Sequence, residues 1–169
     1  MRNIDQLHIR PTRPDDQAQL LPLIAAFRVA LGQLRGHTPT PDLDAARQEL
    51  QDYQRQNYPI FVAEGQAGRL VGYLVCRVQD EIVWAESLFV SPAQRRQGVG
   101  SALYAQAETL AQDLGGDAPY NWVHPNNDKI IAFLQKRGYN VLNLVELRRP
   151  WPGEETTQKI QVGQHKFDY

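Results

Sequence analysis

The chain has 169 residues, of which 42% are hydrophobic and 22% charged, and its formal net charge at pH 7 is -1. This length is typical of one globular domain with a sizeable core, and the balanced charge argues against broad binding to nucleic acid. One cysteine, Cys76, excludes a disulfide within the chain, and no apolar run approaches the roughly 20 residues of a membrane-spanning helix. We therefore expect a cytoplasmic protein, and four scattered histidines predict no metal site.

The first half of the chain contains helix and strand patterns in turn. Residues 7–11 indicate a short strand, and apolar residues at spacings of three and four predict a helix from about Asp15 to Gly32. A loop and a second helix, from about Asp42 to Gln56, follow. Three β-branched runs separated by turn signals then predict adjacent antiparallel strands at 59–64, 69–78 and 82–90.

The second half continues with a helix from Val99 to Gly115 and then alternates strands with one more helix. These further elements are a short strand at 120–124, a helix at 126–137 and a last long strand, Tyr139 to Leu147. The order predicts an α/β fold with a mixed, mostly antiparallel central sheet and helices on both faces. We expect one domain over 1–150, with 151–169 as a covering strand, a subunit contact or a partly disordered tail.

A basic, glycine-bearing turn joins the strand ending at Val90 to the helix starting at Val99. The first N–H groups of a helix have no partner within it and face outward at the positive end of its dipole, so they suit an anion. Gly98 and Gly100 let a bulky phosphate approach the main chain. The turn is no Walker loop, since Ser101 replaces the lysine, and no dinucleotide motif, since Leu103 replaces the third glycine.

Two motifs resemble those of the GNAT superfamily of N-acetyltransferases. The first is R-x-x-G-x-G/A, filled by Arg95, Gly98 and Gly100 after the run L-F-V-S-P at 88–92. The second is a later block with Asn127, Phe133 and the run K-R-G-Y at 136–139. The resemblance covers about Ile9 to Leu147.

The resemblance implies that the strands at 82–90 and 120–124 splay apart and admit the pantetheine arm of acetyl-CoA. The turn would bind its diphosphate, and the edge of the strand at 88–90 would pair with the arm as an added strand does. A main-chain N–H near Leu88 or Phe89 would meet the thioester oxygen. The residues expected to bind the cofactor are Leu88, Phe89, Val90, Arg95, Arg96, Gln97, Gly98, Val99, Gly100, Ser101, Asn127 and Phe133. Arg95 and Arg96 fit equally a solvated pair of charges, and Asn127 a helix N-terminus.

Glu86 is the candidate catalytic base, because it is a lone carboxylate in an apolar strand, where desolvation raises a pKa toward neutrality. Alternation along a strand puts Glu86 on one face with Trp84 and Leu88, so Trp84 is expected to line the acceptor site together with Glu86. The alternative is a half-exposed strand residue paired with a nearby arginine.

The chain departs from the family where many relatives carry a tyrosine that protonates the thiolate, because Leu134 stands there. Tyr139, Tyr120 and His124 are candidates for this acid, with Tyr139 taken as the catalytic one. A water is another possibility, as is release without a dedicated acid, and His124 fits equally a satisfied polar residue before Pro125.

The expected function is acetyl transfer from acetyl-CoA to a primary amine of a small molecule or protein, directly within a ternary complex. A non-catalytic module that binds acetyl-CoA or CoA and acts through a partner protein is the alternative. Glu49, Asp52 and Glu86 are compatible with a cationic acceptor. A homodimer is common among similar proteins, whereas nucleic acid and membranes are not expected as partners.

Overall fold

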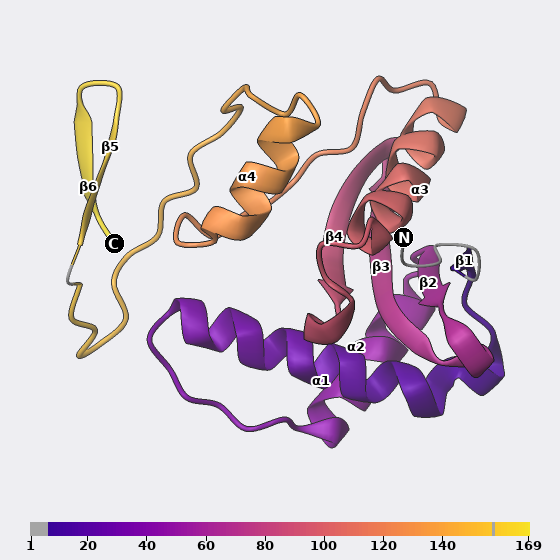
Figure 1. Ribbon diagram of the computed structural model, residues 1–169. Helices are drawn as coiled ribbons and strands as arrows, with labels where there is room; N and C mark the ends of the chain where they lie inside the picture. Colours follow the sequence, from indigo (N-terminus) through magenta and orange to yellow (C-terminus); the bar gives the residue numbers. More distant parts are fainter. Residues whose placement is uncertain (1–6, 157) are drawn as a thin grey trace. The chain divides into compact units, whose positions relative to one another are not determined.

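The computed structural model describes residues 7–156 and 158–169 (Figure 1). The chain divides into two compact units, Met1–Ala132 and Phe133–Tyr169. Across the described residues, none of the helices is both long enough and apolar enough to cross a membrane.

The first unit is built on a four-stranded sheet with the order β1-β2-β3-β4. All three neighbouring pairs are antiparallel, and β2 to β4 confirm the three adjacent strands that the β-branched runs predict. The strands are β1 His8–Pro11, β2 Ile60–Glu64, β3 Leu70–Gln79 and β4 Ile82–Val90. Short turns join β2 to β3 and β3 to β4, which fixes the order of these strands along the sheet.

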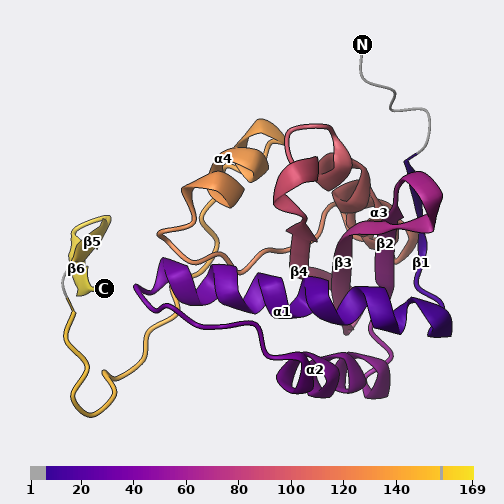
Figure 2. The same cartoon turned by 60° about the horizontal axis from the view of Figure 1, so that its bottom comes forward.

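Helices cover both faces of this sheet (Figure 2). One face packs against α1 (Gln17–Leu34) and α2 (Leu43–Arg55), around a core that includes Tyr73 and Phe89. The other face packs against α3 (Val99–Asp113) through a second set of apolar side chains. Each predicted helix forms within a few residues of its expected bounds, because its apolar stripe matches a sheet face that needs covering.

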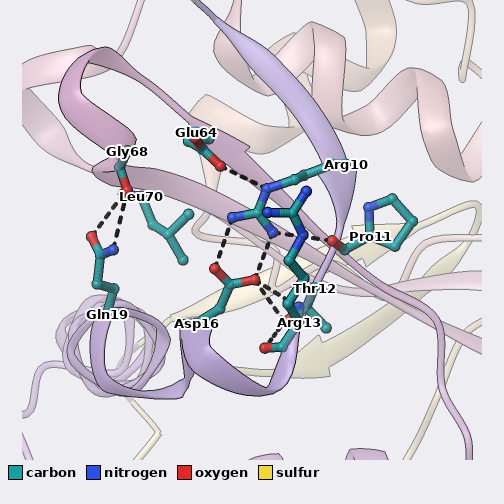
Figure 3. A network of polar contacts seen from close by, with 9 residues as sticks. All are labelled: Arg10, Pro11, Thr12, Arg13, Asp16, Gln19, Glu64, Gly68 and Leu70. Carbon is teal, nitrogen blue, oxygen red and sulfur yellow. Dashed lines mark hydrogen bonds and ion pairs between the residues drawn. The ribbon is translucent and has the colours of Figure 1, made fainter.

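A buried ion cluster joins β1, β2 and the start of α1 (Figure 3). The guanidinium of Arg10 donates to both carboxylate oxygens of Asp16 at 2.6 and 2.8 Å, and its Nε donates to Glu64 at 2.6 Å. Arg10 and Asp16 are 8% and 5% exposed. Because both charges are shielded from water, each depends on the other for its hydrogen bonds. Arg10 lowers the pKa of Asp16 below its ordinary value, mainly by this hydrogen bond.

Gly72 on β3 has no room for a side chain, and we expect Gly72→Ala to destabilise the fold by about 1–3 kcal/mol, the usual range for overpacking. A Cβ there would lie 2.7 Å from the carbonyl oxygen of Phe89 and 3.2 Å from Leu103. Urea unfolding measures the change. Gly100→Ala is the control, because its Cβ would make only an ordinary contact of 3.7 Å with Val90. Equal midpoints for the two variants would contradict the prediction.

The second unit contains a β-hairpin of β5 (Lys159–Val162) and β6 (His165–Asp168). The helix α4 (Asp128–Lys136) has residues in both units. The predicted strand Tyr139–Leu147 is wrong, because these residues form no regular secondary structure and Val141 is 89% exposed. Its apolar pattern is that of a strand, but a strand needs a neighbour to pair its N–H and C=O groups, and these residues have none within the described chain.

Candidate active site

The turn from β4 to α3 has the backbone of an anion-binding loop. A 3-10 turn at Pro92–Gln94 is followed by positive φ angles at Arg96 (61°) and Gly98 (83°), after which α3 begins. The left-handed Gly98 turns the chain sharply into the helix. An added Cβ at Gly98 would meet nothing within 4 Å, so the space above this residue is open.

The N–H groups of residues 96–101 have no acceptor in the part of the chain that the structure describes. α3 has no side-chain cap, and within the described chain these N–H groups donate to no backbone or side-chain acceptor. Gly98, the N-cap, is exposed, as are Arg96 and Ser101. A row of free donors at the positive end of a helix dipole fits a diphosphate.

The side chains of Arg95 and Gln97 hold the turn in place. Nε of Arg95 donates to the carbonyl oxygen of Val90 at 2.8 Å, and its guanidinium lies 5.5 Å from the ring centre of Phe89. Nε2 of Gln97 donates to the carbonyl oxygen of Ala93 at 3.0 Å. Arg95 and Arg96 are both exposed, and Arg95 contacts the end of β4 through this hydrogen bond and the ring of Phe89.

Most of the outer edge of β4 has no strand beside it. The predicted strand Tyr120–His124 is wrong beyond its first residue, because only Tyr120 pairs with β4, in one parallel bridge to Trp84. After this bridge the two segments form no further ladder, and the side chain of Asn121 accepts a hydrogen bond from Tyr104 instead. The edge of β4 from residue 86 to 90 is thus unpaired within the described residues.

The ladder shows which N–H groups face this open edge. Ser91 donates its N–H inward to Val71. Because directions alternate along a strand, the N–H of Phe89 also faces β3, and those of Leu88 and Val90 face the open edge. Of the two residues expected to meet the thioester oxygen, Leu88 has the suitable direction and Phe89 does not.

A β-bulge puts Glu86 at the start of the open edge. β3 pairs Val75 with Ser87 and Cys76 with Ala85, so Glu86 is the extra residue on β4. The bulge reverses the alternation, and Ala85 and Leu88 both pack in the α3-side core. The expectation that Glu86 shares a face with Leu88 is therefore wrong, because strict alternation assumes a ladder without an extra residue.

Arg77 on β3 lies between aromatic rings beside Glu86. Its guanidinium carbon is 4.4 Å from the ring centre of Trp84 and 4.2 Å from that of Trp122. Its Nε is 3.8 Å from Oε2 of Glu86, too far for a hydrogen bond but close enough for an ion pair. The Glu86 side chain is 30% exposed. The alternative for Glu86, a half-exposed residue near an arginine, describes this geometry.

A model of the acetyltransferase (GNAT) family matches residues 28–139. The chain belongs to the GNAT acetyltransferase family. This confirms the resemblance that the two motifs indicate, the α/β fold class and the assignment as an N-acetyltransferase. No curated protein matches the sequence.

Solved acetyltransferase structures share the fold of this GNAT protein. An aminoglycoside acetyltransferase from an uncultured soil metagenomic sample, solved with trehalose, matches with a TM-score of 0.65 and 20% identity over 88% of this chain and 98% of its own. AAC(6′)-Iy in complex with the bisubstrate analog CoA-S-monomethyl-acetylneamine matches with a TM-score of 0.63 and 19% identity over 86% of this chain and 98% of its own. PaiA N-acetyltransferase of Thermoplasma acidophilum, in complex with coenzyme A, matches with a TM-score of 0.64 and 16% identity over 78% of this chain and 87% of its own.

The second motif of this GNAT protein falls on α4 and the residues on either side of it. The side chain of Asn127 accepts a hydrogen bond from the N–H of Ile130 at 3.4 Å, so Asn127 caps the helix. Phe133 and Tyr139 belong to the second unit, where the guanidinium of Arg137 lies over the ring of Phe133 and the N–H of Tyr139 donates to Leu134. Their roles toward the coenzyme and the thiolate stay predictions.

A polar network behind the bulge was not expected from the sequence. The hydroxyl of Tyr53 on α2 donates to Glu49 and lies 3.1 Å from Oγ of Ser87, and Arg28 on α1 also donates to Glu49. Burial, and then the bond to Glu49, raise the pKa of Tyr53. The spacing of Glu49 and Tyr53, four residues apart on one helix, was the available signal, but nothing in the sequence points from them to Ser87.

Proposed function

We propose that this GNAT enzyme transfers the acetyl group of acetyl-CoA directly to a primary amine. The observation that carries the proposal is the set of N–H donors at residues 96–101 that have no acceptor among the described residues. They lie directly after a strand edge on which the N–H groups of Leu88 and Val90 face outward, with no strand paired to them in the described chain. A diphosphate at the turn and an amide-bearing arm along β4 would satisfy both sets of groups. Cys76 is buried, and burial raises its thiol pKa to about 12, which disfavours a covalent acyl-enzyme on this residue.

The residues of β4 provide the chemistry that direct transfer requires. When bound, acetyl-CoA supplies an acetyl group as a thioester, whose carbonyl carbon a neutral amine can attack. The N–H of Leu88 donates to the carbonyl oxygen as negative charge builds on it. Glu86 accepts the proton that the amine nitrogen loses, directly or through a water, as the C–N bond forms and the C–S bond breaks.

The acid that protonates the departing thiolate remains one of several groups. Leu134 is 6% exposed and has no proton to donate. Burial, and to a lesser extent Arg35, lower the pKa of His124, which makes its imidazolium form scarce at neutral pH. This favours Tyr139, Tyr120 or a water over His124.

Purified protein titrated with acetyl-CoA, followed by thioester consumption over a panel of primary amines, tests the function. Binding and amine-dependent release of thiol are the expected results. Binding without turnover on any amine would instead favour the alternative, a CoA-binding module that acts through a partner, which the absent tyrosine at position 134 would suit. No binding would overturn both.

Gly100→Glu is expected to weaken acetyl-CoA binding by about 100-fold, because a carboxylate at the first turn of α3 would oppose the diphosphate. The fold should tolerate the change, since a Cβ at Gly100 would make one ordinary contact. Calorimetry measures the affinity, and a thermal melt checks the fold. Gly100→Gln is the control for size, and an equal loss in both variants would contradict a charge effect at this turn.

A further inference from the structure

An exposed aromatic surface lies where β4 and the residues after Tyr120 part. The ring centre of Trp84 is 5.9 Å from that of Tyr120 and 6.5 Å from that of Trp122. Tyr120 is 46% exposed and Trp122 is 63% exposed. Large aromatic side chains cost free energy when they face water, and a cluster of them beside a site is typical of ligand contact. We call Trp84, Tyr120 and Trp122 the aromatic wall.

The two charged side chains that contact each other beside this wall have opposite signs. Glu86 at the bulge has Arg77 at 3.8 Å, and the same guanidinium covers two of the three rings. A second cation stacked on those rings would face the charge of Arg77.

The other two acidic residues that were compatible with a cationic acceptor are also paired. Glu49 accepts hydrogen bonds from Arg28 and Tyr53, and Asp52 lies 3.2 Å from Arg55. Attraction of a polycation needs an excess of negative charge, and these pairs leave none on the three carboxylates. These three carboxylates therefore offer no unpaired charge to an acceptor with several amines.

We infer that the acceptor is a monoamine that carries a flat aromatic ring, with the ring on the aromatic wall and the amine at Glu86. This inference rests on the proposed function. Trp122 offers the largest exposed ring surface of the wall, and an aromatic ring that is itself neutral stacks there without repulsion from Arg77. Glu86 would then accept a proton from the single amine nitrogen of this acceptor.

The test compares three amines as acceptors for the purified enzyme with acetyl-CoA: 2-phenylethylamine, hexylamine and spermidine. We expect kcat/KM for 2-phenylethylamine to exceed that for hexylamine by about two- to tenfold, the range that one aromatic pair supplies. Spermidine should be the poorest of the three. The rate with 2-phenylethylamine should depend only weakly on salt, because no field of excess charge steers a monoamine.

Two variants assign the preference to the wall. Trp122→Leu should remove the preference for 2-phenylethylamine over hexylamine, whereas Trp122→Phe, which retains a ring, should keep most of it. A preference that survives in Trp122→Leu would overturn the inference, as would hexylamine or spermidine as the best substrate of the natural enzyme. In those cases the proposed function stands. Acetyl-CoA binding with no turnover on any amine would overturn the proposed function itself, and the inference with it.

Discussion

Glu86→Gln is expected to lower kcat by about 10²- to 10⁴-fold, the usual contribution of a positioned general base. The amide has nearly the same size and shape as the carboxylate, but it cannot accept the proton that the attacking amine must lose. Glu86 is the extra residue of the β4 bulge, at the point where the strand loses its outer neighbour. The bulge directs this side chain beside the open edge, where the thioester would lie.

The affinity for acetyl-CoA and the thermal midpoint of Glu86→Gln should stay close to those of the natural protein. Assays of thiol release over a range of pH measure kcat. A binding titration measures the affinity, and a thermal melt measures the midpoint. Glu81→Gln is the matched control, because it removes the same charge from an exposed residue in the turn before β4. If Glu86→Gln turned over as fast as the natural enzyme at every pH, Glu86 would have no part in the chemistry.

Arg10→Met is expected to destabilise the fold by about 3–5 kcal/mol, the cost of removing one partner from a buried ion pair. Asp16 would keep the N–H of Arg13, at 2.7 Å, but would lose both bonds from the guanidinium. Methionine retains much of the apolar length of arginine, so the loss reports mainly the uncompensated carboxylate. Unfolding in urea, followed by circular dichroism, measures the change.

The double variant Arg10→Met with Asp16→Leu should recover a large part of this loss, because it removes the orphaned charge as well. Arg55→Met is the surface control. It breaks an exposed pair with Asp52, and we expect it to cost no more than about 1 kcal/mol. A loss in Arg10→Met as small as in this control would show that the cluster contributes little.

The same cluster makes stability depend on pH. The pKa of Asp16 is lowered in the folded state, so between its folded value and its ordinary value of 3.8 the unfolded chain binds more protons. The stabilisation of the fold by Asp16 is therefore fully present above about pH 3.8 and is lost as the pH falls through the folded pKa of Asp16. In Arg10→Met this dependence should shrink, so the two proteins should become more alike in acid.

The sequence predicted those elements whose signals are local. The strands at 59–64, 69–78 and 82–90 have β-branched runs bounded by turn residues, and the helices of the first unit have clear apolar stripes. The turn at residues 95–101 could also be predicted, because free N–H groups at a helix start follow from helix geometry alone. Its two glycines and its arginine then carried the family resemblance.

Features that depend on pairing between distant segments could not be predicted. The bulge at Glu86 depends on the register between β3 and β4. The predicted face of Leu88 was therefore wrong, although the strand itself was predicted correctly. The pattern at 139–147 indicates a propensity to form a strand, but it says nothing of whether a neighbouring strand is there to pair with. The stacking of Arg77 between Trp84 and Trp122 joins three segments, and no spacing along the chain indicates it.

The bond from Arg95 to the carbonyl oxygen of Val90 fastens the glycine turn to the last residue of β4. Two surfaces, the row of donors on the helix and the edge of the strand, are thereby set at a fixed spacing before any ligand arrives. A long, flexible ligand that binds the helix donors at one end extends along the strand edge from that fixed point. The length of its arm would therefore determine which of its atoms lies opposite Glu86.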